Sequence, residues 1–92
     1  MQDMQETYKT IENEVLVTIE KHLDLVIEPE DRAEHLFSKK IDMDEVSLLY
    51  LVCILEEKYG IRFDEGDFAS GDFFYIEGLA HRLYDKVLGK QP

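Results

Sequence analysis

The strongest structural signal in this sequence lies between residues 51 and 61, which read Leu-Val-Cys-Ile-Leu-Glu-Glu-Lys-Tyr-Gly-Ile. With the apolar residues just before it, this stretch is apolar on more than one side of a helix, which predicts a central helix covered on more than one face. Gly60 can adopt the left-handed conformation that ends a helix, and Ile61 is placed for the accompanying hydrophobic contact. Cys53, inside the apolar run, is interpreted as a small core residue.

The start of this central helix is marked by acidic residues. Asp44 is the expected N-cap, because its carboxylate can accept hydrogen bonds from the unpaired amides of the first turn. Asp42 and Glu45 add negative charge where the helix dipole is positive. We therefore expect the helix to begin close to Asp44.

Two further amphipathic helices flank the central one. An apolar stripe with three-and-four spacing predicts a long first helix from Tyr8, with the members Ile11, Val15, Leu16, Ile19 and Leu23. A similar stripe predicts a long last helix that ends at Gly89, with the members Ile76, Leu79, Ala80, Leu83, Val87 and Leu88. Residues 64–69 are expected to form one short helical turn. No segment alternates with the period of a strand, so we expect an all-α fold of three longer helices and one short helix.

The connections between these helices carry apolar residues of their own. Pro29 disfavours helix and predicts a loop after the first helix. Three apolar residues are expected to pack this loop onto the core: Leu36, Phe37 and Ile41. The aromatic residues Phe68 and 73–75 are interpreted as a cover over the core; rings left exposed there would form a docking patch.

Length and charge limit the classes of function. The chain of 92 residues, 45% hydrophobic and 34% charged, predicts a single domain over residues 1–92 with tails at 1–6 and 90–92. The longest apolar run, residues 48–55, is shorter than a membrane span, and the N-terminus lacks a signal pattern, so we expect a cytoplasmic protein. We also expect a monomer. A net charge of −11 disfavours nucleic acid and anionic membranes. Ten acids against two bases between positions 41 and 77 instead favour a basic protein surface as the partner.

The sequence offers no pattern of catalytic or metal-binding residues. His22, His35 and His81 are scattered, with no ligand at metal-site spacing, and are interpreted as surface or packing residues. The acidic run that starts at Asp42 resembles the beginning of a calcium loop, but the glycine and the closing glutamate are missing. Phosphate loops and nucleophile elbows are absent as well. We therefore expect no enzyme, no metal and no cofactor.

Three motifs together resemble the acyl and peptidyl carrier protein family. Residues 51–61 are similar to the family's Leu-Val-x-x-Leu-Glu-Glu-x-Phe/Tyr-Gly-Ile helix end, and residues 37–46 are similar to its Phe-x-x-x-Leu-Gly-x-Asp-Ser-Leu segment. Residues 76–80, Ile-Glu-Gly-Leu-Ala, resemble the start of its last helix. The resemblance implies a four-helix bundle in which an acidic central helix is recognised by basic partner enzymes.

The position that carries the prosthetic group in that family has changed in this chain. Glu45 occupies the place of the serine that takes 4′-phosphopantetheine, and Asp42 occupies the place of a glycine. A phosphodiester needs a hydroxyl oxygen, so a carboxylate cannot carry the arm. Ser47 is a weak substitute, because two residues rotate its side chain about 200° around the helix. Cys53 is weaker still, because a thiol in apolar surroundings is usually inert.

These observations predict a non-catalytic interaction module related to carrier proteins, acting in a biosynthetic or peptide-maturation system. Its partner-binding residues are expected to be the acids of the central helix: Asp42, Asp44, Glu45, Glu56 and Glu57. Two alternatives stay open. One is a working carrier with 4′-phosphopantetheine on another residue such as Ser47, and the other is a structural dimerisation module that uses exposed aromatic residues.

Overall fold

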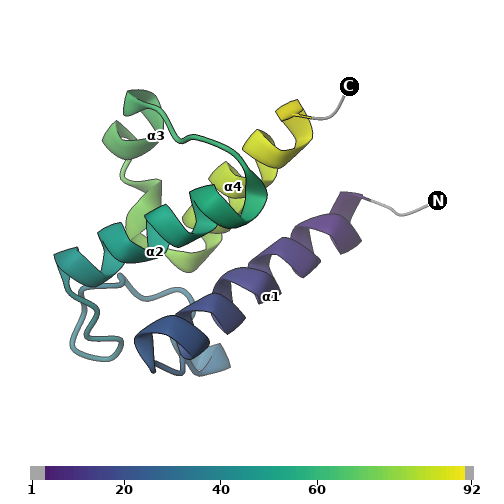
Figure 1. Cartoon of the computed structure of the whole chain (residues 1–92). Helices are drawn as coiled ribbons and strands as arrows, with labels where there is room; N and C mark the ends of the chain where they lie inside the picture. The colour runs from purple at the N-terminus through teal and green to yellow at the C-terminus, as the bar shows by residue number, and fades with distance from the viewer. Residues whose placement is uncertain (1–3, 91–92) are drawn as a thin grey trace.

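The computed structural model of the chain describes residues 4–90, with side chains for residues 7–89. Three longer helices, α1 (Met4–Leu23), α2 (Glu45–Tyr59) and α4 (Ile76–Lys90), are joined by one short helix, α3 (Glu65–Ala69), and two 3₁₀ turns, η1 (Pro29–Asp31) and η2 (Asp72–Phe74) (Figure 1). The described residues contain no strand, which confirms the predicted all-α class with three longer helices and one short one. Over the same residues, no helix combines the length and apolarity needed to cross a bilayer.

The outer helices are longer than predicted. Helix α1 already begins at Met4, and α4 continues past Gly89 to Lys90. Residues 4–6 and 90, expected in the tails, are therefore helical, whereas 1–3 and 91–92 lie outside the described residues.

Both ends of α2 are set by local signals, as predicted. The Asp44 carboxylate accepts a hydrogen bond from the backbone N–H of Ser47 at 2.7 Å. At the other end, Gly60 adopts a left-handed conformation with φ of 64°, and the N–H of Ile61 donates to the carbonyl of Glu56 at 3.1 Å. Sequence patterns local to a few residues therefore determine where this helix begins and ends.

The three longer helices enclose one hydrophobic core. Helix α1 packs most extensively against α4, and α2 runs antiparallel along α1 (Figure 1). Each helix contributes fully buried side chains: Val15 and Ile19 from α1, Leu51 and Leu55 from α2, and Leu79 and Leu83 from α4. The predicted stripes of α1 and α4 thus do form the core faces of these helices.

The long connection between α1 and α2 is tied to the turn before α4. The backbone N–H of Leu36 donates to the carbonyl of Phe74 at 2.8 Å, and the N–H of Met43 donates back to the carbonyl of Leu36 at 2.9 Å. Leu36 and Ile41 are buried, as predicted. Phe37, in contrast, is 40% exposed, because its ring lies at the surface beside His35 and Phe74 instead of entering the core.

Ion pairs attach the short helix α3 to α4. The Lys86 ammonium contacts Asp64 at 2.9 Å and the buried Asp67 at 3.1 Å, while the Arg82 guanidinium bridges Asp67 and Asp72. Asp64 also caps α3, accepting from the N–H of Asp67. The hydrogen bond from Lys86, followed by that from the Asp67 backbone, lowers the pKa of Asp64 to about 2.

We expect Leu51→Ala to destabilise the protein by about 2–5 kcal/mol, because it leaves a cavity in the core. Leu49→Ala is the matched control on the same helix: Leu49 is 55% exposed, against 0% for Leu51. Its loss should cost less than about 1 kcal/mol. Urea unfolding followed by circular dichroism measures both. Equal losses in the two variants would mean that α2 does not present Leu51 to the core.

We expect Asp64→Asn to lower stability in a pH-dependent way. The folded-state pKa of about 2 lies below the ordinary value of about 3.9, so ionised Asp64 stabilises the fold above about pH 4, and this contribution disappears as the pH falls through about 2. Urea unfolding at pH 7, 4 and 2 should show that the difference in the free energy of unfolding between the wild type and the variant shrinks as the pH falls. Glu65→Gln is the matched control, because it removes the neighbouring exposed carboxylate, which forms none of the ion pairs with Arg82 or Lys86.

Candidate functional site

The acidic residues predicted to bind a partner lie at the two ends of α2. Asp42, Asp44 and Glu45 stand at its beginning, and Glu56 and Glu57 stand in its last turn. Glu57 lies twelve positions after Glu45, which is about 18 Å along the helix axis. The structure therefore divides the predicted acidic face into two clusters with a different surface between them.

The cluster at the beginning of α2 combines structural and free carboxylates. Asp44 is exposed but engaged as the N-cap, and the hydrogen bond from the Ser47 backbone lowers its pKa. Asp42 is exposed and adopts a left-handed conformation with φ of 58°. Glu45 occupies the first position of the helix, where it is exposed and its carboxylate has no hydrogen-bond partner among the described residues. Glu45, the one of these three acids that lies within α2, therefore has a carboxylate that is free to contact another molecule.

The two acids at the end of α2 have different surroundings. The carboxylate of Glu56 is half-buried and accepts a hydrogen bond from the backbone N–H of Phe63 at 2.9 Å, which holds the chain as it leaves the helix. Glu57 is exposed and has no ion-pair partner among the described residues. Of the two, Glu57 has the freer charge for a partner, and Glu56 stabilises the fold.

Between the two acidic clusters, α2 exposes an apolar strip. Its four members are Val46, Leu49, Tyr50 and Cys53, with exposed fractions of 76% for Val46 and 51% for Tyr50. The prediction that α2 is covered on more than one side is therefore wrong, as is the placing of Cys53 in the core. Only the face with Leu48, Leu51, Val52 and Leu55 is buried, because no other element packs over the opposite face.

The start of this strip borders an aromatic pocket of about 320 Å³, which we call the Glu45 pocket. Its lining residues are Phe37, Glu45, Leu48, Leu49, Val52, Phe68, Phe73 and Phe74. Phe73 is buried, as expected of a core cover, whereas Phe68 and Tyr75 are more than 40% exposed. The aromatic residues of α3 and of the segment after it therefore serve both purposes considered from the sequence: some cover the core and some lie at the surface.

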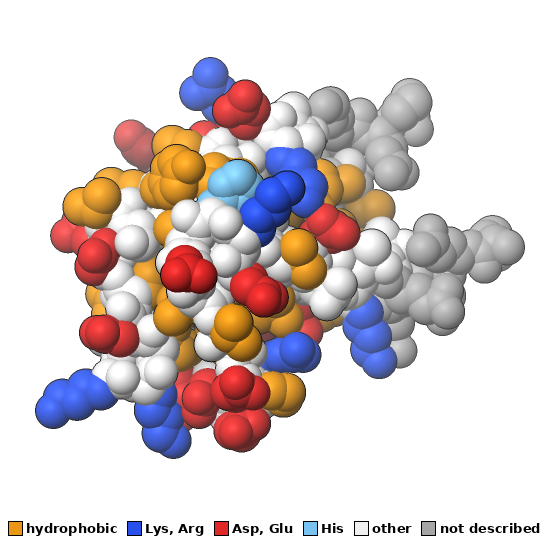
Figure 2. All heavy atoms as spheres, turned by 60° about the horizontal axis from the view of Figure 1, so that its bottom comes forward, with side chains coloured by type: hydrophobic (Ala, Val, Ile, Leu, Met, Phe, Trp, Pro, Cys, Tyr) orange, Lys and Arg blue, Asp and Glu red, His pale blue; other side chains and the backbone are white. Residues whose placement is uncertain are grey.

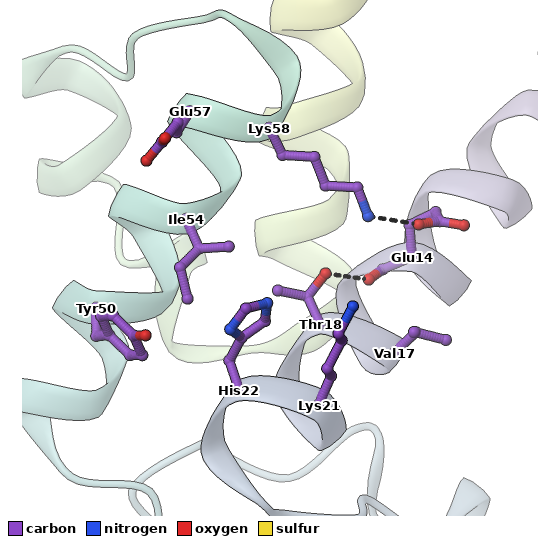
Figure 3. A pocket seen from close by; sticks show the side chains of 9 residues that line it. All are labelled: Glu14, Val17, Thr18, Lys21, His22, Tyr50, Ile54, Glu57 and Lys58. Atoms are coloured by element: carbon purple, nitrogen blue, oxygen red, sulfur yellow. Dashed lines mark hydrogen bonds and ion pairs between the residues drawn. The ribbon is translucent and has the colours of Figure 1, made fainter.

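A second, wider groove of about 690 Å³ runs between α1 and α2 (Figure 3). Ile54 and Tyr50 project from α2 toward Thr18 and His22 of α1, and a hydrogen bond of 2.6 Å from Lys58 to Glu14 bridges the helices at one end. That hydrogen bond raises the pKa of Lys58. The Thr18 hydroxyl donates to the carbonyl of Glu14 at 2.7 Å, so it is engaged in the helix and is not poised as a nucleophile.

The histidines pack against aromatic rings. His81 stacks on Tyr8 with ring centroids 4.4 Å apart, and His35 stacks on Phe74 at 5.0 Å. His22 meets the Tyr50 ring edge-on at 6.4 Å. Over the described part of the chain, no group of three or more His, Cys, Asp or Glu side chains could hold a metal ion.

Sequence reasoning located the acids but missed the apolar strip. A signal for it existed: positions 46, 49, 50 and 53 repeat with three-and-four spacing, just as the buried positions 48, 51, 52 and 55 do. Two such stripes on one helix indicate two apolar faces, and only the packing of the other helices decides which face is buried.

In Figure 2, apolar and acidic side chains lie beside one another across the face toward the viewer, with no large region of either kind.

Comparison of this chain with protein-family models, with curated proteins and with solved structures finds no match.

Proposed function

We propose that this protein is an interaction module related to acyl and peptidyl carrier proteins that has lost the attachment of the prosthetic group. It is non-catalytic, and it docks through α2 to a basic surface of a partner enzyme in a biosynthetic or peptide-modification system. The observation that carries this proposal is the exposed apolar strip on α2, with free carboxylates at both of its ends.

Local geometry supports the carrier-like register. The residue at the family's glycine position, Asp42, adopts the positive φ that glycine favours. Asp44, aligned with the family's aspartate, caps α2, and Gly60 of the helix-end motif is left-handed. Two of the three motifs quoted for the resemblance, residues 37–46 and 51–61, therefore contain residues with a local structural role at one end of α2.

The attachment position does not fit 4′-phosphopantetheine. Glu45 stands exposed where the hydroxyl would be needed, and its carboxylate cannot form the phosphodiester. Ser47 is half-buried within the first turn of α2, so it does not replace Glu45 at the surface. A carboxylate at this point instead adds charge for recognising a basic partner.

Self-association is the second candidate, because the same apolar strip could pack against a second copy. In a two-fold arrangement of α2 against α2, however, the acids at the ends of one strip would face those of the other. Repulsion between like charges then opposes the contact, so we expect a monomer. Sedimentation at several concentrations that showed a stable dimer would favour this second candidate over docking to a basic partner.

We expect the wild type to stay unmodified when incubated with coenzyme A and a broad-specificity phosphopantetheinyl transferase, and Glu45→Ser to gain the mass of the arm. The reason is that position 45 is exposed at the start of α2, where a serine would present the hydroxyl that the phosphodiester needs. Intact-protein mass spectrometry reads both. Modification of the wild type would contradict the proposal, and a Ser47→Ala variant would then show whether Ser47 carries the arm.

We expect Glu57→Lys to weaken binding to the partner enzyme about two- to five-fold, because a rim charge of this kind contributes up to about 1 kcal/mol. Glu20→Lys is the matched control, since it makes the same charge change at an exposed position of α1. Calorimetric titration at low and moderate salt measures the affinities. Equal effects of the two variants would mean that α2 is not the docking face. Glu56 is unsuitable for this test, because its carboxylate accepts the hydrogen bond from Phe63.

A further inference from the structure

We propose that the Glu45 pocket receives one apolar side chain of the partner protein, and that this side chain stands next to a lysine or arginine that pairs with Glu45. This inference rests on the docking function proposed above and specifies the chemistry of the partner at one point of contact.

The shape of the pocket fits an anchoring side chain. Seven of its eight lining residues are apolar. Its floor is formed by buried side chains, Leu48, Val52 and Phe73, and its rim by the exposed Phe37, Leu49 and Phe68. A volume of about 320 Å³ is at the lower end of the range for ligand pockets, about 300–1,000 Å³, which suits a single large side chain. Binding energy in protein interfaces concentrates in such pockets.

Contacts between separate segments hold the pocket in shape. The ring of Phe37, from the long connection, meets Phe74 edge-on with centroids 5.4 Å apart, and Phe68 of α3 meets Phe73 in the same way at 5.0 Å. The hydrogen bond from Leu36 to Phe74 fixes the two segments to each other. A pocket formed in advance needs little ordering on binding, so more of the contact energy becomes affinity.

The negative charge of Glu45 at the rim of the pocket favours a basic residue next to the partner's apolar side chain. Glu45 is the one charged residue in the lining and pairs with none of the described residues. Asp42 and Asp44 stand just before it in the chain and strengthen the negative potential there. An apolar group beside a cation therefore gains both contacts at once, whereas an apolar group beside a carboxylate is repelled.

The test uses two small probes that share a chain length and differ in charge, n-hexylammonium and hexanoate. Titration of the isotope-labelled full chain, followed by two-dimensional NMR, should show hexylammonium shifting the amides of Leu48, Leu49, Phe68 and Phe74. Hexanoate should bind about two- to five-fold more weakly, and Glu45→Gln should remove most of this difference. Leu49→Asn should weaken hexylammonium binding, and Val46→Asn should not, because Val46 is an exposed residue of the same helix outside the pocket.

Each other outcome would overturn the inference. Stronger binding of hexanoate would mean that the pocket takes an anionic or neutral chain and not the apolar anchor of a basic partner. Shifts confined to the groove between α1 and α2, or equal effects of Leu49→Asn and Val46→Asn, would place the contact elsewhere. If hexylammonium does not bind while Glu57→Lys still weakens docking, the anchor is wrong and the docking function stands. If hexylammonium binds as expected while Glu57→Lys and Glu20→Lys act alike, the pocket binds an apolar cation but docking through α2 fails, and with it the claim that a partner side chain fills the pocket.

Discussion

The structure depends on the burial of one face of α2. Leu51 and Leu55 are fully enclosed where α2 meets the core formed with α1 and α4, and their burial fixes the rotation of the helix about its own axis. Once that rotation is fixed, the positions of Glu45, Leu49, Cys53 and Glu57 on the solvent side follow from helical geometry alone. The surface proposed for docking is thus the side of α2 opposite the core. A substitution that rotates the buried face would also move the exposed residues.

The connection between α1 and α2 and the segment after α3 form a pocket beside this exposed face of α2. They come from distant parts of the chain, and a backbone hydrogen bond between Leu36 and Phe74 joins them near the start of α2. Their aromatic rings then enclose space that a helix by itself could not enclose. The ion pairs of Arg82 and Lys86 with the acids around α3 hold the far wall of this region against α4.

The features that could be predicted from the sequence are those fixed within one or two helical turns. The cap at Asp44, the end at Gly60 and the apolar stripes of α1 and α4 depend on neighbours in the chain, and all were located correctly. The exposure of Cys53 and Phe37 could not be predicted, because it depends on where other helices stop covering the surface. The structural role of Glu56 was missed for a related reason: its acceptor function appears only after the chain turns back at Gly60 to bring Phe63 within reach.

The exposure of the chain's one cysteine has a practical consequence for handling the protein. Cys53 lies in the middle of the apolar strip, and an accessible thiol is open to oxidation. A disulfide between two copies formed in air would join them face to face at the strip and cover it. Purification without a reducing agent would then yield a covalent dimer in which the apolar strip is covered. A fluorophore placed on the same sulfur would instead report directly on whatever approaches this side of the helix.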